Sequence, residues 1–125
     1  MYFTEDLNKE YLELEKLILS FKHNKIKDTL FLCNNVRAKF PRLNEISSFH
    51  NLLGLISLKL KDYSKSEISF LEAIKIRKDF PEAYFNLSLI YFNNGNLEKS
   101  YNALNIAYSL KKNYSSARDK MIELL

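Results

Sequence analysis

Apolar and small residues recur at helical spacing in two parts of the chain. Each part places such residues at positions i, i+3, i+4 and i+7: His50, Leu53, Gly54 and Ser57 in the first, and Tyr84, Leu87, Ser88 and Tyr91 in the second. This spacing puts four side chains on one face of an α-helix. A similar stripe follows each of them: Ser66, Phe70, Ala73 and Ile76, and then Ser100, Leu104, Ala107 and Leu110. The pattern therefore predicts two pairs of helices, joined by turns at Lys61-Asp62 and at Asn94-Gly95-Asn96.

The two predicted helix pairs are copies of one repeat. A shift of 34 residues aligns Leu53 with Leu87, Leu55 with Leu89, Ile56 with Ile90, Lys65 with Lys99, Ser66 with Ser100, Ala73 with Ala107, Lys78 with Lys112 and Ala83 with Ala117. Small residues on both helices of a pair, such as Gly54 and Ser66, let the two helices approach closely. A repeat of this length predicts helical hairpins that stack on their neighbours.

These units resemble the tetratricopeptide repeat, a helix–turn–helix unit of 34 residues. The third unit reads Tyr84-Phe85-Asn86-Leu87-Ser88 and continues with Tyr91, Gly95, Ser100 and Ala107, close to the family pattern at those offsets. The second unit keeps Leu53, Gly54, Tyr63, Ser66, Phe70 and Ala73, but has His50 in the aromatic place, Ser57 for Tyr and Lys61 for the turn Gly. The resemblance implies an all-α fold, a right-handed solenoid of helical hairpins.

The resemblance implies one domain over residues 1–125. We expect a degenerate first repeat at about 10–41, a second at about 47–80, a third at about 81–114 and a capping helix at about 115–125. Counting back from Pro41 places Cys33 and Thr29 in the positions of Phe70 and Ser66, with an offset of 37 because three extra residues lie in the linker 42–47. The last helix is either a cap, with a polar outer face from Arg118, Asp119, Lys120 and Glu123, or the start of a hairpin that is cut short.

The composition favours a helical fold and a cytoplasmic location. Only two glycines and two prolines are present, which disfavours a fold with many tight turns. No apolar stretch is long enough to span a membrane. Residues 1–6 lack the pattern of a secretory or transit signal, and a single cysteine, Cys33, fits a reducing compartment. We therefore expect a cytoplasmic protein.

The resemblance also implies a binding surface. In stacked hairpins of this family the first helix of each unit lines a concave groove, and residues beside its core stripe contact the ligand. Here those positions hold Asn51, Leu55, Leu58, Lys59, Phe85, Asn86, Leu89, Phe92 and Asn93. Apolar and amide groups favour an extended peptide or an amphipathic helix, with the Asn side chains free to bond the ligand's backbone. The alternative is that Leu55, Leu58 and Phe92 pack against neighbouring first helices.

One known use of the family is not expected in this chain. Gripping the acidic C-terminal tail of heat-shock chaperones requires Lys and Asn in the first unit, Asn in the second, and Lys and Arg in the third. The corresponding places hold Glu15, Leu19, Leu52, Glu82 and Asn86, or, one repeat further on, Asn51, Leu55, Asn86, Ser116 and Lys120. We predict that the chain does not bind such a tail.

Catalysis, metal binding and cofactor binding have no support in the sequence. His23 and His50 have no acidic or thiol partner at metal-ligand spacing, and His50 falls at a packing position. Cys33 is read as a small core residue on a second helix. The chain has no Gly-rich phosphate loop, since Gly95 belongs to a turn. We expect no catalytic residue, no metal and no cofactor.

Nucleic acid is a less favoured partner despite a net charge of +4. The cations cluster at the predicted C-terminal ends of second helices, where they interact favourably with the helix dipole: Lys75, Arg77, Lys78, Lys111 and Lys112. The face that would read bases carries apolar residues instead. The basic charge therefore does not point to a nucleic-acid interface.

The sequence as a whole predicts a non-enzymatic interaction module or adaptor. Its partner would be a protein or peptide bound in the groove of the stacked hairpins, and the chain does not identify that partner. The alternative is a segment, or a relative, of the repeat array of a larger glycosyltransferase or sulfotransferase, where it would present a protein substrate. Exposed repeat ends also make self-association plausible.

Overall fold

The computed structural model describes residues 7–125 and is all-helical over that range. Its helices, in chain order, are α1 (Asn8–Lys22), α2 (Ile26–Lys39), the 3-10 helix η1 (Pro41–Glu45), α3 (Ser47–Lys59), α4 (Tyr63–Ile76), α5 (Pro81–Asn93), α6 (Leu97–Leu110) and α7 (Ser115–Glu123). Residues 1–6, in which the sequence shows no signal pattern, lie outside the described residues. None of the helices within residues 7–125 is both long enough and apolar enough to cross a bilayer.

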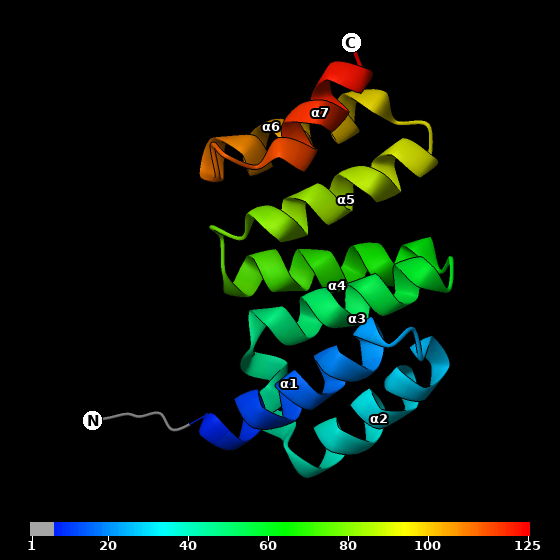
Figure 1. Cartoon of the computed structure of the whole chain (residues 1–125), viewed down its shortest axis with the longest axis vertical. Helices are drawn as coiled ribbons and strands as arrows, with labels where there is room; N and C mark the ends of the chain where they lie inside the picture. The colour runs from blue at the N-terminus through cyan, green and yellow to red at the C-terminus, as the bar shows by residue number, and fades with distance from the viewer. Residues whose placement is uncertain (1–6) are drawn as a thin grey trace, which may run out of the picture.

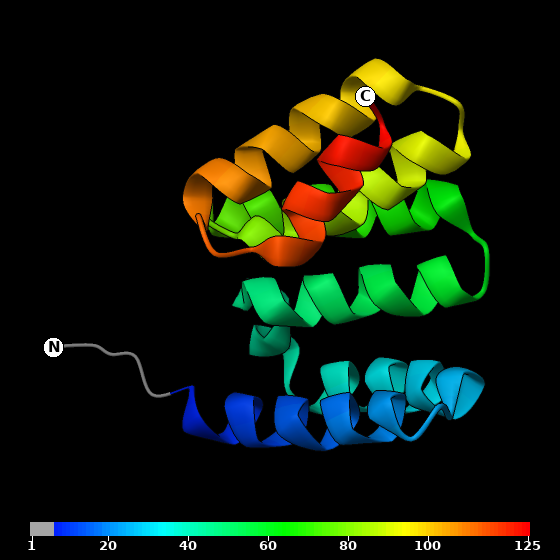
Figure 2. The same ribbon diagram turned by 45° about the horizontal axis from the view of Figure 1, so that its top comes forward.

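The helices form antiparallel hairpins that stack in chain order. Helices α1 and α2 lie at one end, α3 and α4 follow, and α5, α6 and α7 lie at the other end (Figure 1). Turned by 45°, the same stack shows α7 in front of α5, with α6 above them (Figure 2), and α6 packs against both α5 and α7. The fold is therefore the predicted all-α solenoid of helical hairpins, which ends in a further single helix.

Buried serines make the second and third hairpins equivalent. The hydroxyl of Ser66 donates to the carbonyl of Gly54 at 2.7 Å, and that of Ser100 donates to the carbonyl of Ser88 at 2.8 Å. Both serine side chains are fully buried, so each hydroxyl needs a partner inside the protein. A small hydroxyl-bearing residue thus brings the two helices of a hairpin close together without leaving a polar group unpaired.

In the first hairpin, the residue that matches Ser66 and Ser100 forms a different hydrogen bond. Thr29 is also fully buried, but its hydroxyl donates to the carbonyl of Lys25 in its own helix at 2.6 Å. The same oxygen lies 2.7 Å from the hydroxyl of Ser20 in α1. A side chain from the facing helix therefore replaces the backbone carbonyl used in the later hairpins, which accounts for the weak repeat pattern of this unit.

Each hairpin turn contains one residue with a left-handed backbone. Asn24, Lys61 and Gly95 have φ values of 62°, 63° and 78°, and these positions are separated by the sequence offsets of 37 and 34 residues. Asp62 and Asn96 then cap α4 and α6 by accepting hydrogen bonds from the backbone N–H groups of Lys65 and Lys99. The turn geometry is thus repeated although glycine stands at only one of the three left-handed positions.

Replacing Lys61 with glycine is expected to stabilise the protein. A positive φ is unfavourable for a residue with a Cβ, and removing that strain outweighs the greater freedom of glycine in the unfolded chain. We expect Lys61→Gly to raise the free energy of unfolding by roughly 0.5–1 kcal/mol in urea titrations. Lys59→Gly, placed in helical backbone two residues earlier, should instead lower it by a similar amount. Equal effects of the two variants would contradict this account of the turn.

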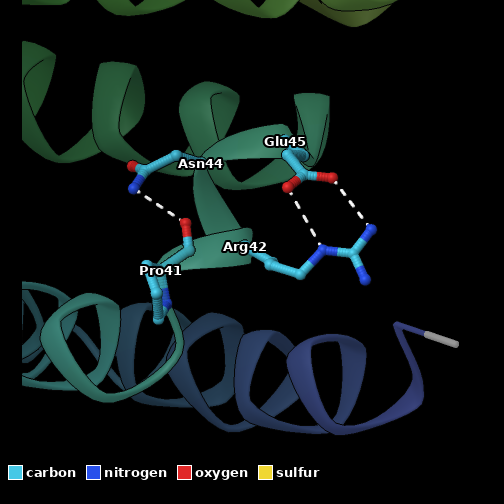
Figure 3. A network of polar contacts seen from close by, with 4 residues as sticks. All are labelled: Pro41, Arg42, Asn44 and Glu45. Carbon is cyan, nitrogen blue, oxygen red and sulfur yellow. Dashed lines mark hydrogen bonds and ion pairs between the residues drawn. The ribbon is translucent and has the colours of Figure 1, made fainter. Parts of the chain in front are cut away.

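The linker between the first two repeats is itself folded. Residues Pro41–Glu45 form the 3-10 helix η1, in which Leu43 is fully buried. Arg42 donates two hydrogen bonds to the carboxylate of Glu45, and the amide of Asn44 donates to the carbonyl of Pro41 (Figure 3). The side chain of Leu43 joins a core made by α1, α2 and α3, in which the buried members are Leu14, Leu17, Cys33, Leu43, Ile46, Phe49, Leu52 and Ile56. The extra residues of the linker therefore pack the first hairpin onto the second.

Candidate functional site: the inner face of the stack

The candidate site is the surface formed by the first helices of the hairpins. Helix α3 packs against both α1 and α5, and α7 follows on the far side of α5. We call the exposed surface of α1, α3, α5 and α7 the inner face. The resemblance places the ligand groove of the family on this side. The predicted site residues come from α3 and α5, the two central helices of this face.

A depression in the inner face lies between α1 and α3. Its volume is about 300 Å³, and its lining residues are Ile18, Phe21, Lys22, Ser48, Asn51, Leu52 and Leu55. Most of these side chains are apolar, and Lys22 is an exposed cation at the end of α1. A cavity of this size accepts a large aliphatic or aromatic side chain.

At the other end of the inner face, α7 covers part of α5. The ring of Phe85 lies 5.3 Å from that of Tyr114, at the start of α7, and both rings belong to the core around Leu104 and Ala117. Phe92 is 39% exposed, and the ammonium group of Lys120 lies 4.8 Å from its ring centre. Phe85 is therefore largely a packing residue, whereas Phe92 presents an open aromatic surface beside a cation.

Two predicted amides bond to each other. The side-chain amide of Asn86 donates to the side-chain oxygen of Asn51 at 3.1 Å and thereby links α5 to α3. Asn86 is only 8% exposed. This differs from the expectation that both amides are free for a ligand's backbone, because Asn86 is held in the floor of the inner face.

The other predicted residues divide between core and rim. Leu55 and Leu58 are half-buried and pack against the core of Phe70, Leu87 and Ile90. Lys59 and Asn93 are exposed at the C-terminal ends of α3 and α5, and Leu89 is half-buried. The packing role considered as an alternative for Leu55 and Leu58 is thus present, although Leu55 also lines the depression.

The contribution of α1 was absent from the predicted site. Ile18, Phe21, Lys22 and Ser48 are not among the predicted site residues. The structure brings them together with Asn51 and Leu55 in one depression. The offset of 37 residues, applied to the predicted residues Leu55, Leu58 and Lys59, would have pointed to three of them: Ile18, Phe21 and Lys22.

A second apolar depression lies on the opposite side, between α4 and α6. Its volume is about 350 Å³, and it is lined by Leu71, Ile74, Tyr84, Leu87, Tyr91, Lys99, Asn102, Ala103 and Ile106. The floor comes from the core stripe of α5, and the hydroxyl of Tyr91 donates to Glu67 at 3.3 Å. Because this outer depression is separate from the inner face, it offers a matched place for control substitutions.

Three titratable side chains, those of His50, Cys33 and Tyr114, have packing roles. His50 is buried, and its Nε2 lies 2.8 Å from the carbonyl oxygen of Asn44. Burial raises the pKa of the Cys33 thiol to about 11, with Arg37 opposing the rise. Burial likewise raises the pKa of Tyr114 to about 12, and the Glu82 carboxylate adds to that rise. Both groups are therefore neutral near pH 7, and residues 7–125 hold no acidic, His and Cys cluster suited to a metal ion.

Comparison with known proteins identifies the repeat. Two models of the tetratricopeptide repeat match the chain, one over residues 47–80 and the other over residues 69–100. The chain therefore contains tetratricopeptide repeat sequence within residues 47–100. A search of curated protein sequences returned no match.

Solved structures share the fold of this chain. The first repeat domain of Spaghetti (RPAP3), bound to an HSP90 peptide, has a TM-score of 0.82 at 17% identity over 95% of this chain and 92% of that one. A type III secretion chaperone of Yersinia enterocolitica, SycD in complex with a peptide of the translocator YopD, has a TM-score of 0.74 at 16% identity over 96% and 88%. An O-GlcNAc transferase of Thermobaculum terrenum has a TM-score of 0.84 at 18% identity over 99% of this chain and 23% of that enzyme. At these identities the likeness shows the fold.

Proposed function

We propose that the chain is a non-enzymatic interaction module that holds a segment of a protein partner on its inner face. The observation that carries this proposal is the presence of apolar groups at two places on that face, the depression lined by Leu55 and the open ring of Phe92. Similar repeat domains bound to peptides, RPAP3 with an HSP90 peptide and SycD with a YopD peptide, support it. Exposed apolar groups that gather on one face are typical of interaction sites.

The proposal is tested by removing the aromatic side chain at the open end of the face. Partners captured from the source cell with the full chain are identified, and the bound segment is titrated against purified chain by fluorescence anisotropy. We expect Phe92→Ala to weaken this complex by at least tenfold, because truncating an aromatic anchor typically costs more than about 1.4 kcal/mol. Its helical content and unfolding midpoint should stay near those of the unaltered chain, since Phe92 is 39% exposed.

Ile106→Ala is the matched control. Ile106 is 41% exposed, close to Phe92, but it lines the outer depression. This variant should bind the segment with unchanged affinity. Loss of binding in Ile106→Ala with full binding in Phe92→Ala would move the site to the outer depression and contradict the proposal.

The proposed partner is not an acidic chaperone tail. In the positions that would grip such a tail, Leu52 is buried, Asn86 bonds to Asn51, and Glu82 pairs with Lys111 at 3.4 Å. We expect no measurable complex between the full chain and the peptide SRMEEVD, which is bound in the RPAP3 structure. Calorimetry that detects a micromolar complex would contradict this part of the proposal.

A further inference from the structure

We infer that the segment held by the inner face is an amphipathic helix with acidic residues along one flank, the flank that lies over the C-terminal ends of α1 and α3. This inference rests on the proposed function and adds the conformation and charge of the partner to it. It follows from two features of the inner face: a depression lined mainly by apolar side chains, and a pair of lysines that form no ion pair within residues 7–125.

The floor of the inner face favours a helix over an extended strand. An extended segment brings its own N–H and C=O groups against the surface, and each one that loses water without a new partner is costly. Asn86 is 8% exposed and donates to Asn51, and four of the seven side chains that line the depression, Leu52 and Leu55 among them, are apolar. A helix satisfies its backbone internally and presents only side chains.

Two lysines define one edge of this surface. Lys22 lines the depression between α1 and α3, and Lys59 lies one helical turn beyond Leu55 at the end of α3. Both are exposed, and neither forms an ion pair with any residue in the described range 7–125. Both ammonium groups are therefore available to an acidic group of a partner.

The nearest acidic residue in sequence does not supply that charge. Asp62 follows Lys59 in the hairpin turn, but its carboxylate caps α4 and lies 4.0 Å from the ammonium group of Lys65. At the opposite edge of the inner face, Glu82 at the start of α5 is paired with Lys111. The inner face is therefore basic along the edge formed by Lys22 and Lys59 and not along the edge of Glu82.

Charge complementarity predicts where acidic residues lie on the partner helix. An apolar stripe on the helix would fill the depression, and Glu or Asp one position to the side of that stripe would meet Lys22 and Lys59. The apolar floor between the two edges distinguishes this ligand from a bare polyanion, which would have nothing to bury there. Because the two lysines are exposed, their contribution should weaken with added salt.

The test is a selection with a displayed library of helical peptides of about 16 residues, roughly 24 Å long, with a fixed apolar stripe and randomised flanks. The immobilised full chain should enrich peptides that carry Glu or Asp along one flank. The double variant Lys22→Glu/Lys59→Glu should enrich Lys or Arg at the same positions. Peptides selected on the unaltered chain should bind this variant roughly tenfold more weakly at low salt.

Two further variants control for folding and for general charge. Lys22→Gln/Lys59→Gln removes the charges without reversing them and should lose the acidic preference while circular dichroism is unchanged. Lys27→Glu/Lys78→Glu makes the same net change at exposed lysines outside the inner face, on α2 and after α4, and should keep the acidic preference.

The outcomes separate this inference from the proposed function. Enriched peptides without an acidic flank, or with the same acidic flank on Lys22→Glu/Lys59→Glu, would overturn the inference and leave the proposed function standing. Loss of the acidic preference in Lys27→Glu/Lys78→Glu would also overturn it. If no helical peptide is enriched on the unaltered chain, the inference fails, whereas the proposed function fails only if Phe92→Ala leaves the affinity for the captured segment unchanged.

Discussion

Replacing Gly54 with alanine is expected to lower the free energy of unfolding by about 2 kcal/mol. An added Cβ at this position would lie 2.5–2.8 Å from three ring atoms of Phe70, which is fully buried in the facing helix of the same hairpin. The ring has no free space to move into, so the helices must separate or the ring must leave its preferred rotamer. This cost exceeds the gain of roughly 0.5–1 kcal/mol that alanine brings to a helix. Urea titration followed by circular dichroism measures the difference.

The third repeat supplies a rescue for this variant. Ser88 and Leu104 occupy there the positions of Gly54 and Phe70, so a slightly larger residue on one helix is matched by a smaller one on the other. We expect Gly54→Ala/Phe70→Leu to be more stable than the sum of the two single changes by at least about 1 kcal/mol. Simple additivity of the two changes would show that the contact between Gly54 and Phe70 does not limit the approach of α3 and α4.

The second large effect is expected at Leu43. This side chain is fully buried between the first two hairpins, although it belongs to a linker. Leu43→Ala should lower the free energy of unfolding by about 2–5 kcal/mol, because the removed methyl groups leave a cavity in the core. Since the same core joins α1 and α2 to α3, the first hairpin should detach at a lower urea concentration than the rest of the chain.

Limited proteolysis detects that detachment. Cleavage of Leu43→Ala should appear first in the segment 39–47, and a fragment that contains α3 to α7 should persist. Leu32→Ala is the matched control, because Leu32 is 41% exposed on α2 and its truncation should change stability by less than about 0.5 kcal/mol. Uniform cleavage along Leu43→Ala would mean that the hairpins unfold together.

The second and third hairpins could be predicted from sequence because their contacts recur at a fixed offset. Ser66 and Ser100 bond equivalent carbonyls, and Asp62 and Asn96 cap equivalent helices. In a repeat array each of these contacts depends on local spacing and on the nearest neighbour alone. A stripe of small and apolar residues therefore contains the information needed to form the hairpin.

The candidate site could be predicted only in part. The resemblance to the tetratricopeptide repeat assigned α3 and α5 to the inner face, and Phe92 is exposed there. It did not show that Phe85 packs against Tyr114, because that contact depends on how α7 crosses α5. Nor did the predicted site include Lys22, although Lys22 lies at the offset of 37 residues from Lys59, because the degenerate first repeat was not used to assign site residues.

The sequence alone determined the helical period, the repeat offset and the positions of the hairpin turns, because these follow from side chains close together in the chain. Only the tertiary structure decided that Leu43 joins two hairpins, that Asn51 pairs with Asn86, and that Lys22 faces Leu55 across a depression. Each of these contacts links neighbouring units whose residues are not copies of one another. Their geometry depends on the path of the backbone between the units, and no local pattern specifies that path.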